Sequence, residues 1–493
     1  MDEVKNVFPV KWEFSGDFAD RAELLWQRLH TDCLYSPEAF FHPAGYGWQG
    51  DFEGRTLLAW ALLGRLLGKT SPFLKPVMEA FPQKVNAQGF FGEFLDPEAI
   101  NEQQLAGHGW LLRAMAEQFI NTGDSFFADG AKNILNNLVV PVIGKIAEYP
   151  VSDGMREAAG EASGSSDRKI GRWQVSTDIG AVFILLDGAL QASDVFQIPL
   201  GTLPQDMITI FRKINLRKMR MQTHATLSFL RAVIRCYEKT LDKELLDYAE
   251  ELFGFYRQFG MTENYANDNW FERPEWTEPC AVIDSFMAAM DLARLTGKAD
   301  YLDSAHRIWF SGVEAGQRNS GGMGCDTCLH DDQPLLQVRY PEATWCCTMR
   351  GGEGFYACGS KALMLQGNTL LVNLPLSGRY TFADGLTIEV TAAYPEAASV
   401  TVKIIAQAGT AVENIRIFTV ENGWENGNVA HGEYPTLRRK TRSGRADCFW
   451  RGPLMMGRRE NCRELVPVNS NWKLSMDELK QSPLKMIFDG SDI

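Results

Sequence analysis

Residues 226–243, TLSFLRAVIRCYEKTLDK, contain the pattern that decides the fold. An amphipathic helical segment, residues 226–238, runs into the short polar turn 241–243, and a second helical segment follows. The same unit recurs at residues 57–67 before turn 68–70, at 111–120 before 122–124, and at 286–295 before 296–298. One hairpin cannot bury both of its apolar faces, so the recurrence predicts hairpins that stack on their neighbours.

Two weaker copies bring the number of predicted hairpins to six. They lie at residues 181–192, before Ser193-Asp194, and at residues 354–365, before Gly367-Asn368. Six hairpins spaced by roughly 50 to 70 residues can close into a ring, which favours an (α/α)6 barrel. The alternative is an open helical-repeat scaffold that binds peptides. That scaffold would need distinct capping repeats and no inward-facing acidic cluster.

The hydrophobic pattern of the sequence changes from helical to strand-like after Gly367. Short alternating segments at 369–374, 386–390, 399–405 and 414–420 are separated by turn residues such as Asn422-Gly423, which predicts an antiparallel β-sandwich. At 493 residues the chain exceeds the usual size of one core. We therefore expect a helical barrel domain over residues 1–366 and a β-sandwich domain over residues 367–493. Residues 150–171, rich in Gly, Ser and charge, are expected to form either a lid or a surface insertion.

Charge and hydropathy narrow the classes of partner. The chain has 49 Lys and Arg against 62 Asp and Glu, a formal charge of −13, and no dense basic run, which argues against nucleic acid. The greasiest segments, 57–67 and 134–146, are too short and too interrupted to cross a membrane. No secretory signal opens the chain, and ten scattered cysteines do not resemble a disulfide scaffold. We expect a cytoplasmic location, with a homo-oligomer possible.

Five cysteines within about seventy residues indicate a metal site. They are Cys280, Cys325, Cys328, Cys346 and Cys347, with Glu278 two residues before the first. Zinc takes Cys and Glu ligands, and neighbouring cysteines supply two ligands at little entropic cost. Two other readings stay open. A closed four-thiolate site that includes Cys325 and Cys328 would be structural, and some of these cysteines could be ordinary core residues.

Helical toroids open into a funnel where the loops between hairpins converge, and ligand sites concentrate in such places. Aromatic faces combined with carboxylates and histidines suit sugars. For any single residue a structural role is the more common one, so the prediction rests on the group. The candidates are Trp48, Asp51, Glu53, Glu93, His108, Trp110, Asp178, His224, Glu263, Trp270, Trp276, Arg350 and Glu353.

The pairing of Glu278-Pro279-Cys280-Ala281 with Cys346-Cys347 resembles the Glu-x-Cys-Ala and Cys-Cys motifs of glycoside hydrolase family 127, the β-L-arabinofuranosidases. The resemblance extends to Gly107-His108 and His224-Ala225 at helix starts, and covers most of the chain together with residues 48–52 and 451–454. It implies an (α/α)6 catalytic barrel followed by β-sandwich domains.

The resemblance also implies a retaining mechanism, in which a zinc-bound cysteine thiolate attacks the anomeric carbon. By position, Cys346 is the nucleophile, and Glu278, Cys280 and Cys347 complete the zinc shell. Glu263 matches the acid/base position, while Glu272 and Glu275 remain open alternatives. Among the substrate-binding candidates His108, His224, Asp51, Trp48 and Arg350, the two histidines match pocket histidines of the family.

Three departures from the family pattern bear on specificity. The Cys-Cys pair is followed by Thr348-Met349-Arg350 where the family commonly has Pro-Pro. The glycine-rich approach to the acid is missing, and Thr177-Asp178 stands where the family has a further pocket histidine. The alternatives are another toroidal carbohydrate enzyme, either a two-carboxylate hydrolase or an epimerase, and a non-catalytic sugar-binding protein with structural zinc.

Overall fold

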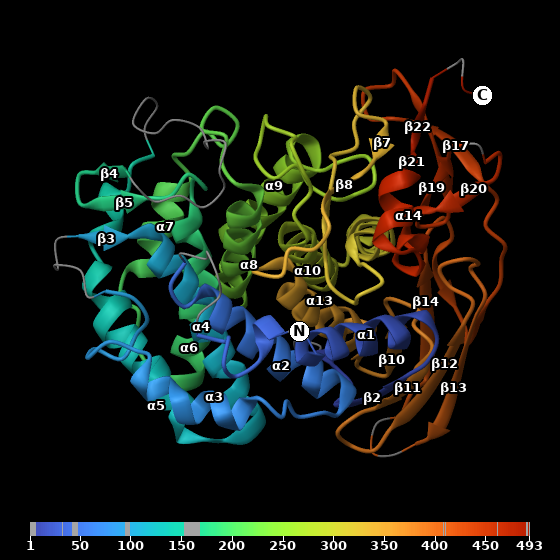
Figure 1. Ribbon diagram of the computed structural model, residues 1–493. Coiled ribbons are helices and arrows are strands. Elements are labelled where there is room, and N and C mark those ends of the chain that lie inside the picture. Colours follow the sequence, from blue (N-terminus) through green and yellow to red (C-terminus); the bar gives the residue numbers. More distant parts are fainter. Residues whose placement is uncertain are drawn as a thin grey trace.

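Six helices form a closed ring in the computed structural model, which describes residues 6–31, 33–41, 48–93, 99–151, 168–407, 409, 411–460, 462–489 and 492. Each ring helix packs against the next, and the last packs against the first. This closure confirms the predicted (α/α)6 barrel and shows that the open-scaffold alternative is wrong (Figure 1). In order around the ring they are α2 (Asp51–Leu67), α4 (Glu102–Thr122), α6 (Leu185–Phe196), α8 (Thr223–Thr240), α10 (Pro279–Thr296) and α13 (Cys347–Lys361).

A second set of helices returns the chain between consecutive ring helices, so the ring helices run parallel and their N-termini share one end of the barrel. Five of them are α3 (Leu74–Ala80), α5 (Ser125–Ile134), α7 (Leu203–Phe211), α9 (Lys243–Phe259) and α11 (Ala299–Arg307). The sixth is α1 (Asp17–Thr31), which packs against both α13 and α2.

The turns that the sequence repeats are helix caps. Gly68, Gly123 and Gly297 end three ring helices in the left-handed conformation, with φ of 65°, 67° and 70°. Asp124 then caps α5 by accepting a hydrogen bond from the backbone of Phe126. A residue that stops one helix is thus followed at once by residues that start the next, which is why the hairpin period is legible in the sequence.

Glycines let three ring helices approach closely. A Cβ added to Gly54 of α2 would lie 2.4 Å from the backbone nitrogen of Leu111 in α4. A Cβ on Gly188 of α6 would lie 1.9 Å from the carbonyl oxygen of Gly109 in α4. Backbone is in contact with backbone here, so no side chain larger than hydrogen fits at these positions.

The sixth hairpin differs from the prediction. Helix α13 ends at Lys361, and the chain continues as strand β9 (Leu363–Gln366) instead of a second helix. Residues 363–366 alternate poorly but are almost wholly buried, so a short apolar run read as helix here is a strand. The missing outer helix is supplied from the other end of the chain by α1.

The β region contains two five-stranded sheets and a larger third one (Figure 1). The four predicted strands are present as β10 (Thr369–Val372), β12 (Thr387–Ala392), β13 (Val400–Ala406) and β14 (Asn414–Thr419). Their ladders are antiparallel except for β10 with β14, which is parallel. The remaining strands of the two sheets are β1 (Asn6–Val7), β2 (Lys11–Phe14), β9, β11 (Gly378–Thr381), β15 (Gly423–Asn426) and β16 (Val429–Ala430).

The third sheet was not predicted as a separate unit. Its path runs β17 (Leu437–Lys440), β18 (Asp447–Arg451), β19 (Leu454–Arg459), β21 (Leu484–Lys485) and β7 (Leu335–Leu336), with β20 (Leu465–Pro467) and β22 (Ile487–Phe488) alongside. Helix α14 (Met476–Gln481) precedes β21. Two small pairings remain among the loops of the barrel. They are β3 (Ile100–Asn101) with β5 (Trp173–Val175) and β4 (Arg168–Ile170), and β6 (Cys325–Asp326) with β8 (Val338–Tyr340).

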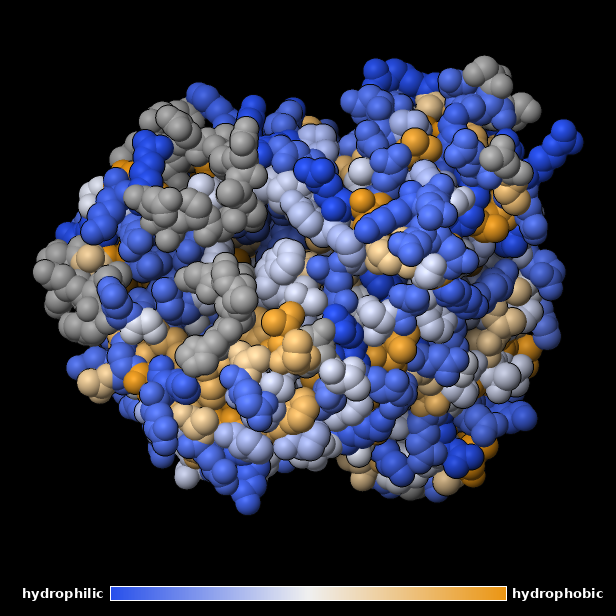
Figure 2. Space-filling model, in the orientation of Figure 1, coloured by the Kyte–Doolittle hydropathy of each residue, from blue (hydrophilic) through white to orange (hydrophobic). Residues whose placement is uncertain are grey.

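None of the described helices is long and apolar enough to cross a membrane. The face drawn in Figure 2 is largely hydrophilic, with apolar residues in smaller patches among polar ones. Most of the predicted lid or insertion at 150–171 lies outside the described residues; its last part forms β4.

Candidate metal and catalytic site

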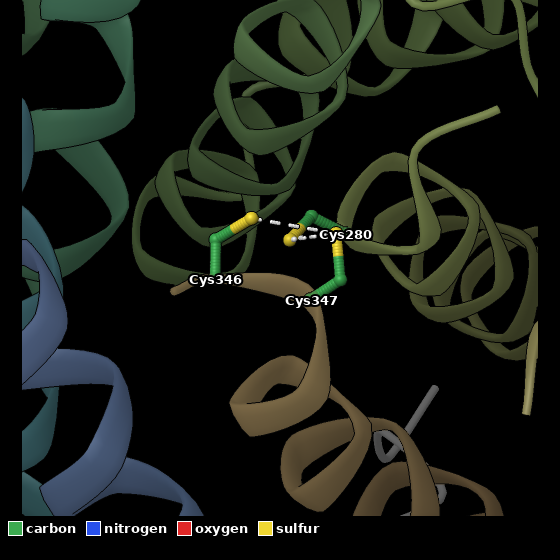
Figure 3. A group of neighbouring side chains, drawn as sticks. All are labelled: Cys280, Cys346 and Cys347. Atoms are coloured by element: carbon green, nitrogen blue, oxygen red, sulfur yellow. Dashed lines mark hydrogen bonds between the residues drawn. The ribbon is translucent and has the colours of Figure 1, made fainter. Parts of the chain in front are cut away.

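Three cysteine sulfurs converge at the N-terminal end of the barrel (Figure 3). Cys280 lies in the first turn of α10, Cys347 begins α13, and Cys346 is the residue just before it. The Cys347 sulfur is 3.5 Å from that of Cys280 and 3.4 Å from that of Cys346. All three are free thiols; Cys280 and Cys347 are buried, whereas Cys346 is half-buried. Cys346 is therefore the member of the group that a ligand can reach.

Glu278 and His224 adjoin this group through Cys280. Donor atoms of His224, Glu278 and Cys280 lie within 4.8 Å of one another, as do those of the three cysteines. Cys280 belongs to both sets, so the four predicted zinc ligands are contiguous around it. His224 Nδ1 is 3.2 Å from Glu278 Oε1, and its Nε2 is 3.4 Å from Asp284 Oδ2. Burial lowers the pKa of His224, but the two carboxylates outweigh it and raise that pKa to about 9.

The loop before α10 fixes the Glu278 carboxylate. The Glu278 backbone N–H donates to Asn267 Oδ1 at 2.7 Å. With the Asn269 amide oriented so that its nitrogen faces Glu278, this nitrogen donates to Oε2 at 2.5 Å, and the amide oxygen accepts from Trp276 Nε1. The loop thus holds the Glu278 backbone and one carboxylate oxygen, while His224 faces the other oxygen, and Glu278 is pre-oriented toward Cys280.

The donor set fits a zinc-like ion. Burial alone would raise the pKa of Cys280, but hydrogen bonds from Cys346 and Cys347, together with Arg55 and His224, hold it well below its usual range. Hydrogen bonding to Cys280 raises the pKa of Cys346, and burial together with the same hydrogen bonding raises the pKa of Cys347, since one negative charge is shared among three sulfurs. A divalent cation would supply the charge that lets all three ionise. Thiolates with one carboxylate are a ligand set that zinc accepts.

The alternative with four thiolates is not assembled. Cys328 donates to the carbonyl oxygen of Asn267 at 3.6 Å, and burial and Asp268 raise its pKa well above the usual value. Among the described residues, neither Cys325 nor Cys328 belongs to a group of converging donors. The structure brings Cys325 beside Cys347 but turns Cys328 toward Asp268, so this alternative lacks one of its ligands.

A residue that the sequence reading missed contacts the thiols. Arg55 Nη1 is 3.4 Å from the sulfur of Cys280, and its Nε pairs with Asp51 Oδ2 at 2.7 Å. Asp51 was predicted to bind substrate; in the structure it is fully buried and holds Arg55. The signal that could have found Arg55 is its i,i+4 spacing from Asp51 at a helix start, which places both side chains on one face.

Trp110 is the aromatic centre of the site. The guanidinium groups of Arg55 and Arg350 lie 4.5 and 4.3 Å from its ring centroid, and the His224 ring stacks on it at 5.8 Å. Arg350, the cation that follows the Cys-Cys pair, is buried and pairs with Asp284 and Glu353. It is thus positioned inside the charge network beneath the thiols and not toward solvent.

His108 does not have a ring nitrogen to spare for a sugar. Its Nδ1 donates to the carbonyl of Gln104 at 2.7 Å, and its Nε2 accepts from the backbone N–H of Phe91 at 3.0 Å. Burial lowers its pKa to about 4, so the ring is neutral. Gly50, between Trp48 and α2, packs on this ring. His108 therefore locks the loop before α2, and the half-buried Trp48 lies in that loop.

The three candidate acids occupy different environments. Glu272 and Glu275 are exposed and pair with Arg217 and Arg273. Glu263 is half-buried, and burial raises the pKa of its carboxyl. Its Oε1 accepts from the backbone N–H of Arg442, in the turn after β17. No hydrogen bond or ion pair joins any of the three to the thiols in the described part of the chain.

Other predicted funnel residues surround the site. Trp270 donates to Asp178 at 3.2 Å and contacts Trp276 at 4.9 Å between ring centroids. Glu53 is buried, and this burial raises its pKa to about 8. Glu93 is exposed in the loop before α4, whereas Glu353 lies in the charge network.

That network fills the barrel beneath the thiols. Arg231 pairs with Asp284 at 2.7 Å and with Glu353 at 3.0 Å, and Arg113 pairs with Glu353 and with Asp187. All five side chains are buried. These side chains come from α4, α6, α8, α10 and α13. The centre of the ring is therefore filled by buried ion pairs and is not a channel.

Known proteins resemble this chain in structure and not in sequence. No known family profile and no curated protein sequence matches the chain. A solved glycoside hydrolase shares 12% identity and superposes over 92% of this chain and 83% of its own, with a TM-score of 0.62. A solved GH127 β-arabinofuranosidase shares 12% identity and superposes over 92% of this chain and 86% of its own, with a TM-score of 0.62. A GH127 β-L-arabinofuranosidase from Geobacillus stearothermophilus T6 shares 15% identity and superposes over 91% of this chain and 86% of its own, with a TM-score of 0.59. Over nine tenths of its length, this chain has the fold of the GH127 β-arabinofuranosidases.

Proposed function

We propose that this chain is a retaining glycoside hydrolase that releases a terminal β-L-arabinofuranosyl residue with a cysteine nucleophile and a zinc ion. One observation carries the proposal: Cys280, Cys346 and Cys347 converge beside Glu278 at the N-terminal end of the ring helices. The shared fold with GH127 enzymes supports it, because sugar-cleaving sites of a toroid lie where its loops converge.

Cys346 is the nucleophile in this proposal because its sulfur is the accessible one of the three. In the first step this sulfur bonds to the anomeric carbon while the glycosidic C–O bond breaks, and an acid protonates the leaving oxygen. In the second step water attacks the anomeric carbon, the C–S bond breaks, and the same group takes up the proton of water. Two inversions retain the configuration.

Glu278, Cys280, Cys346 and Cys347 would hold the zinc ion. When bound, the ion would keep the thiols ionised at neutral pH and fix the direction of the nucleophilic sulfur. Arg55 donates to Cys280, which lowers the electron density on a sulfur that does not react. His224 balances the charge of Glu278 and stacks on Trp110.

Glu263 is the proposed acid/base. Its raised pKa favours the protonated form that a proton donor needs, and its loop also carries the asparagines that hold Glu278. Glu272 and Glu275 are exposed, and each is ion-paired with an arginine. The contact of Glu263 with Arg442 comes from the C-terminal sheet, so the β region would help to position the acid.

The test is nitrophenol release from an aryl β-L-arabinofuranoside by zinc-loaded protein. We expect Cys346→Ala to lower kcat by at least about a thousandfold, since a covalent nucleophile is lost. The control Cys33→Ala removes an exposed cysteine that is far in sequence from Cys346, and it should retain wild-type turnover. Glu263→Gln should lower kcat about a hundredfold or more and flatten one limb of the pH profile.

Each result has a distinct reading. Equal turnover by wild type and folded Cys346→Ala would eliminate the thiolate mechanism and favour a two-carboxylate hydrolase. Full activity of Glu263→Gln would move the acid to another carboxyl. Zinc bound without turnover of any furanoside would support a sugar-binding protein with structural zinc.

A further inference from the structure

A large aromatic side chain is exposed directly before the proposed nucleophile. Trp345 precedes Cys346, and 42% of its surface is accessible, although tryptophan is among the residues that bury the most apolar area. Adjacent Cα atoms are about 3.8 Å apart, so the indole stands at the edge of the thiol group. An exposed tryptophan at that place is available to a ligand of the site.

Trp345 is the outer end of a chain of aromatic contacts. Its ring centroid is 6.4 Å from that of Tyr340, and Tyr340 is 5.5 Å from Trp276. Both pairs are edge-to-face, with interplanar angles of 81° and 90°. Trp276 contacts the fully buried Trp270. The chain thus runs from solvent into the core, and each ring is held by the next.

The same chain is tied to the metal-binding residues. Trp276 Nε1 donates to Asn269, whose amide nitrogen donates to Glu278. Tyr340 ends strand β8 and pairs with Cys325 of β6, beside Cys347. Tyr340 is therefore fixed by a strand pairing and by Trp276, and it gives Trp345 a rigid support at a constant distance from the thiols.

The burial of Cys346 and the exposure of Trp345 indicate which part of a bound glycoside would contact the Trp345 ring. Cys346 is half-buried, so an anomeric carbon reaches its sulfur from the solvent side. Displacement needs the leaving oxygen on the far side of that carbon from the sulfur, which is farther outward. Trp345, exposed at the rim, lies at that outer level. Arg339 is exposed over Tyr340, 5.8 Å from its ring, and adds donors for hydroxyl groups.

We propose that Trp345, supported edge-on by Tyr340, forms a stacking platform for the sugar ring of the leaving group, so that the chain is built for oligosaccharides or glycoconjugates and not for simple alkyl glycosides. This inference rests on the proposed function. An aromatic face packs against the C–H face of a pyranose or furanose ring while the ring hydroxyls remain in water, which is why sugar sites use tryptophan and tyrosine.

The test compares kcat/KM for a β-L-arabinofuranosyl disaccharide with kcat/KM for methyl β-L-arabinofuranoside. In Trp345→Ala the ratio of the two should fall about five- to tenfold, mainly through KM for the disaccharide. Trp345→Phe should restore most of the ratio because it keeps an aromatic face. Trp424→Ala, which removes a half-buried tryptophan of β15, should leave the ratio as in wild type. An unchanged ratio in Trp345→Ala overturns the platform.

A second measurement separates this inference from the proposed hydrolysis. If wild type cleaves neither compound, the hydrolase proposal fails, and calorimetric titration with arabino-oligosaccharide then tests the platform alone. Binding weakened at least fivefold by Trp345→Ala, and unchanged in Trp424→Ala, supports it. Equal binding by all three proteins overturns it. It is also overturned if wild type elutes as a dimer that Trp345→Ala dissociates, because the indole would then cover a second copy of the chain.

Discussion

Arg55 joins the proposed metal ligands to the rest of the barrel. It contacts Cys280 through one nitrogen, Asp51 through another, and Trp110 through its face. Fixing a ligand sulfur from outside the ligand set is a known means of tuning metal affinity. The pairing with Asp51 fixes the guanidinium, so the donor is directed at the sulfur before any metal arrives.

This role predicts that Arg55→Ala weakens zinc binding about 10- to 100-fold, since the hydrogen bond and positive charge beside Cys280 are lost. The affinity would be measured by competition with a chromophoric chelator, which needs no catalytic turnover. The control is Arg65→Ala in the same helix, because Arg65 pairs with Glu117 away from the thiols. Equal zinc affinity of wild type and Arg55→Ala would contradict the role.

The sequence could predict the site only where its residues follow local rules. Glu278, Cys280, Cys346 and Cys347 form two short motifs, and the structure brings these motifs together as expected. The partners that orient them, such as Asn269, depend on how loops pack and have no local signature. The sequence likewise does not show that Gln104 and Phe91 occupy both ring nitrogens of His108.

At the level of helices, the barrel interior is held by ion pairs. Glu353 of α13 accepts from Arg113 of α4 and Arg231 of α8, and all three are buried. Removing one charge from such a group leaves the others unpaired in a medium of low dielectric, at a larger cost than the pair itself contributes. Glu353 thus connects three ring helices that are not neighbours in sequence.

We expect Glu353→Gln to lower the free energy of unfolding by about 3 to 5 kcal/mol, since Arg113 and Arg231 lose a buried counter-charge. Urea denaturation followed by circular dichroism would measure it. Glu238→Gln is the matched control; Glu238 forms an exposed pair with Arg294, so its loss should cost less than about 1 kcal/mol. A loss for Glu353→Gln no larger than that of the control would show that the network does not stabilise the ring.

The hairpins were predictable because their stop and start signals are local. Gly123 ends one helix and Asp124 begins the next, whatever the rest of the chain does. The sixth hairpin was not predictable in this way. Whether residues 363–366 form a helix or a strand is decided by the pairing of β9 with β1 and β10, which are distant or follow later.

At the level of the whole molecule, the two parts of the chain exchange strands. The N-terminal strands β1 and β2 pair with β9 and β11, and β7, from the region between α11 and α13, pairs with β21. The proposed division at residue 366 therefore separates β1, β2, β7 and β9 from the sheets that they complete. Such long-range pairings leave no signal in composition. A prediction from sequence therefore places the boundary where helical patterns give way to strand-like patterns.

We expect residues 367–493 expressed alone not to fold, because the fragment would lack an edge strand of each large sheet and expose unpaired backbone. Its amide NMR spectrum should lack dispersion, and urea should unfold it without a cooperative transition. Co-expression with residues 1–366 is the control: the two fragments should co-purify and recover cooperative unfolding, since the missing strands are then supplied. A dispersed spectrum of the isolated fragment would instead show that the strands from the helical part decorate a β-domain that is stable by itself.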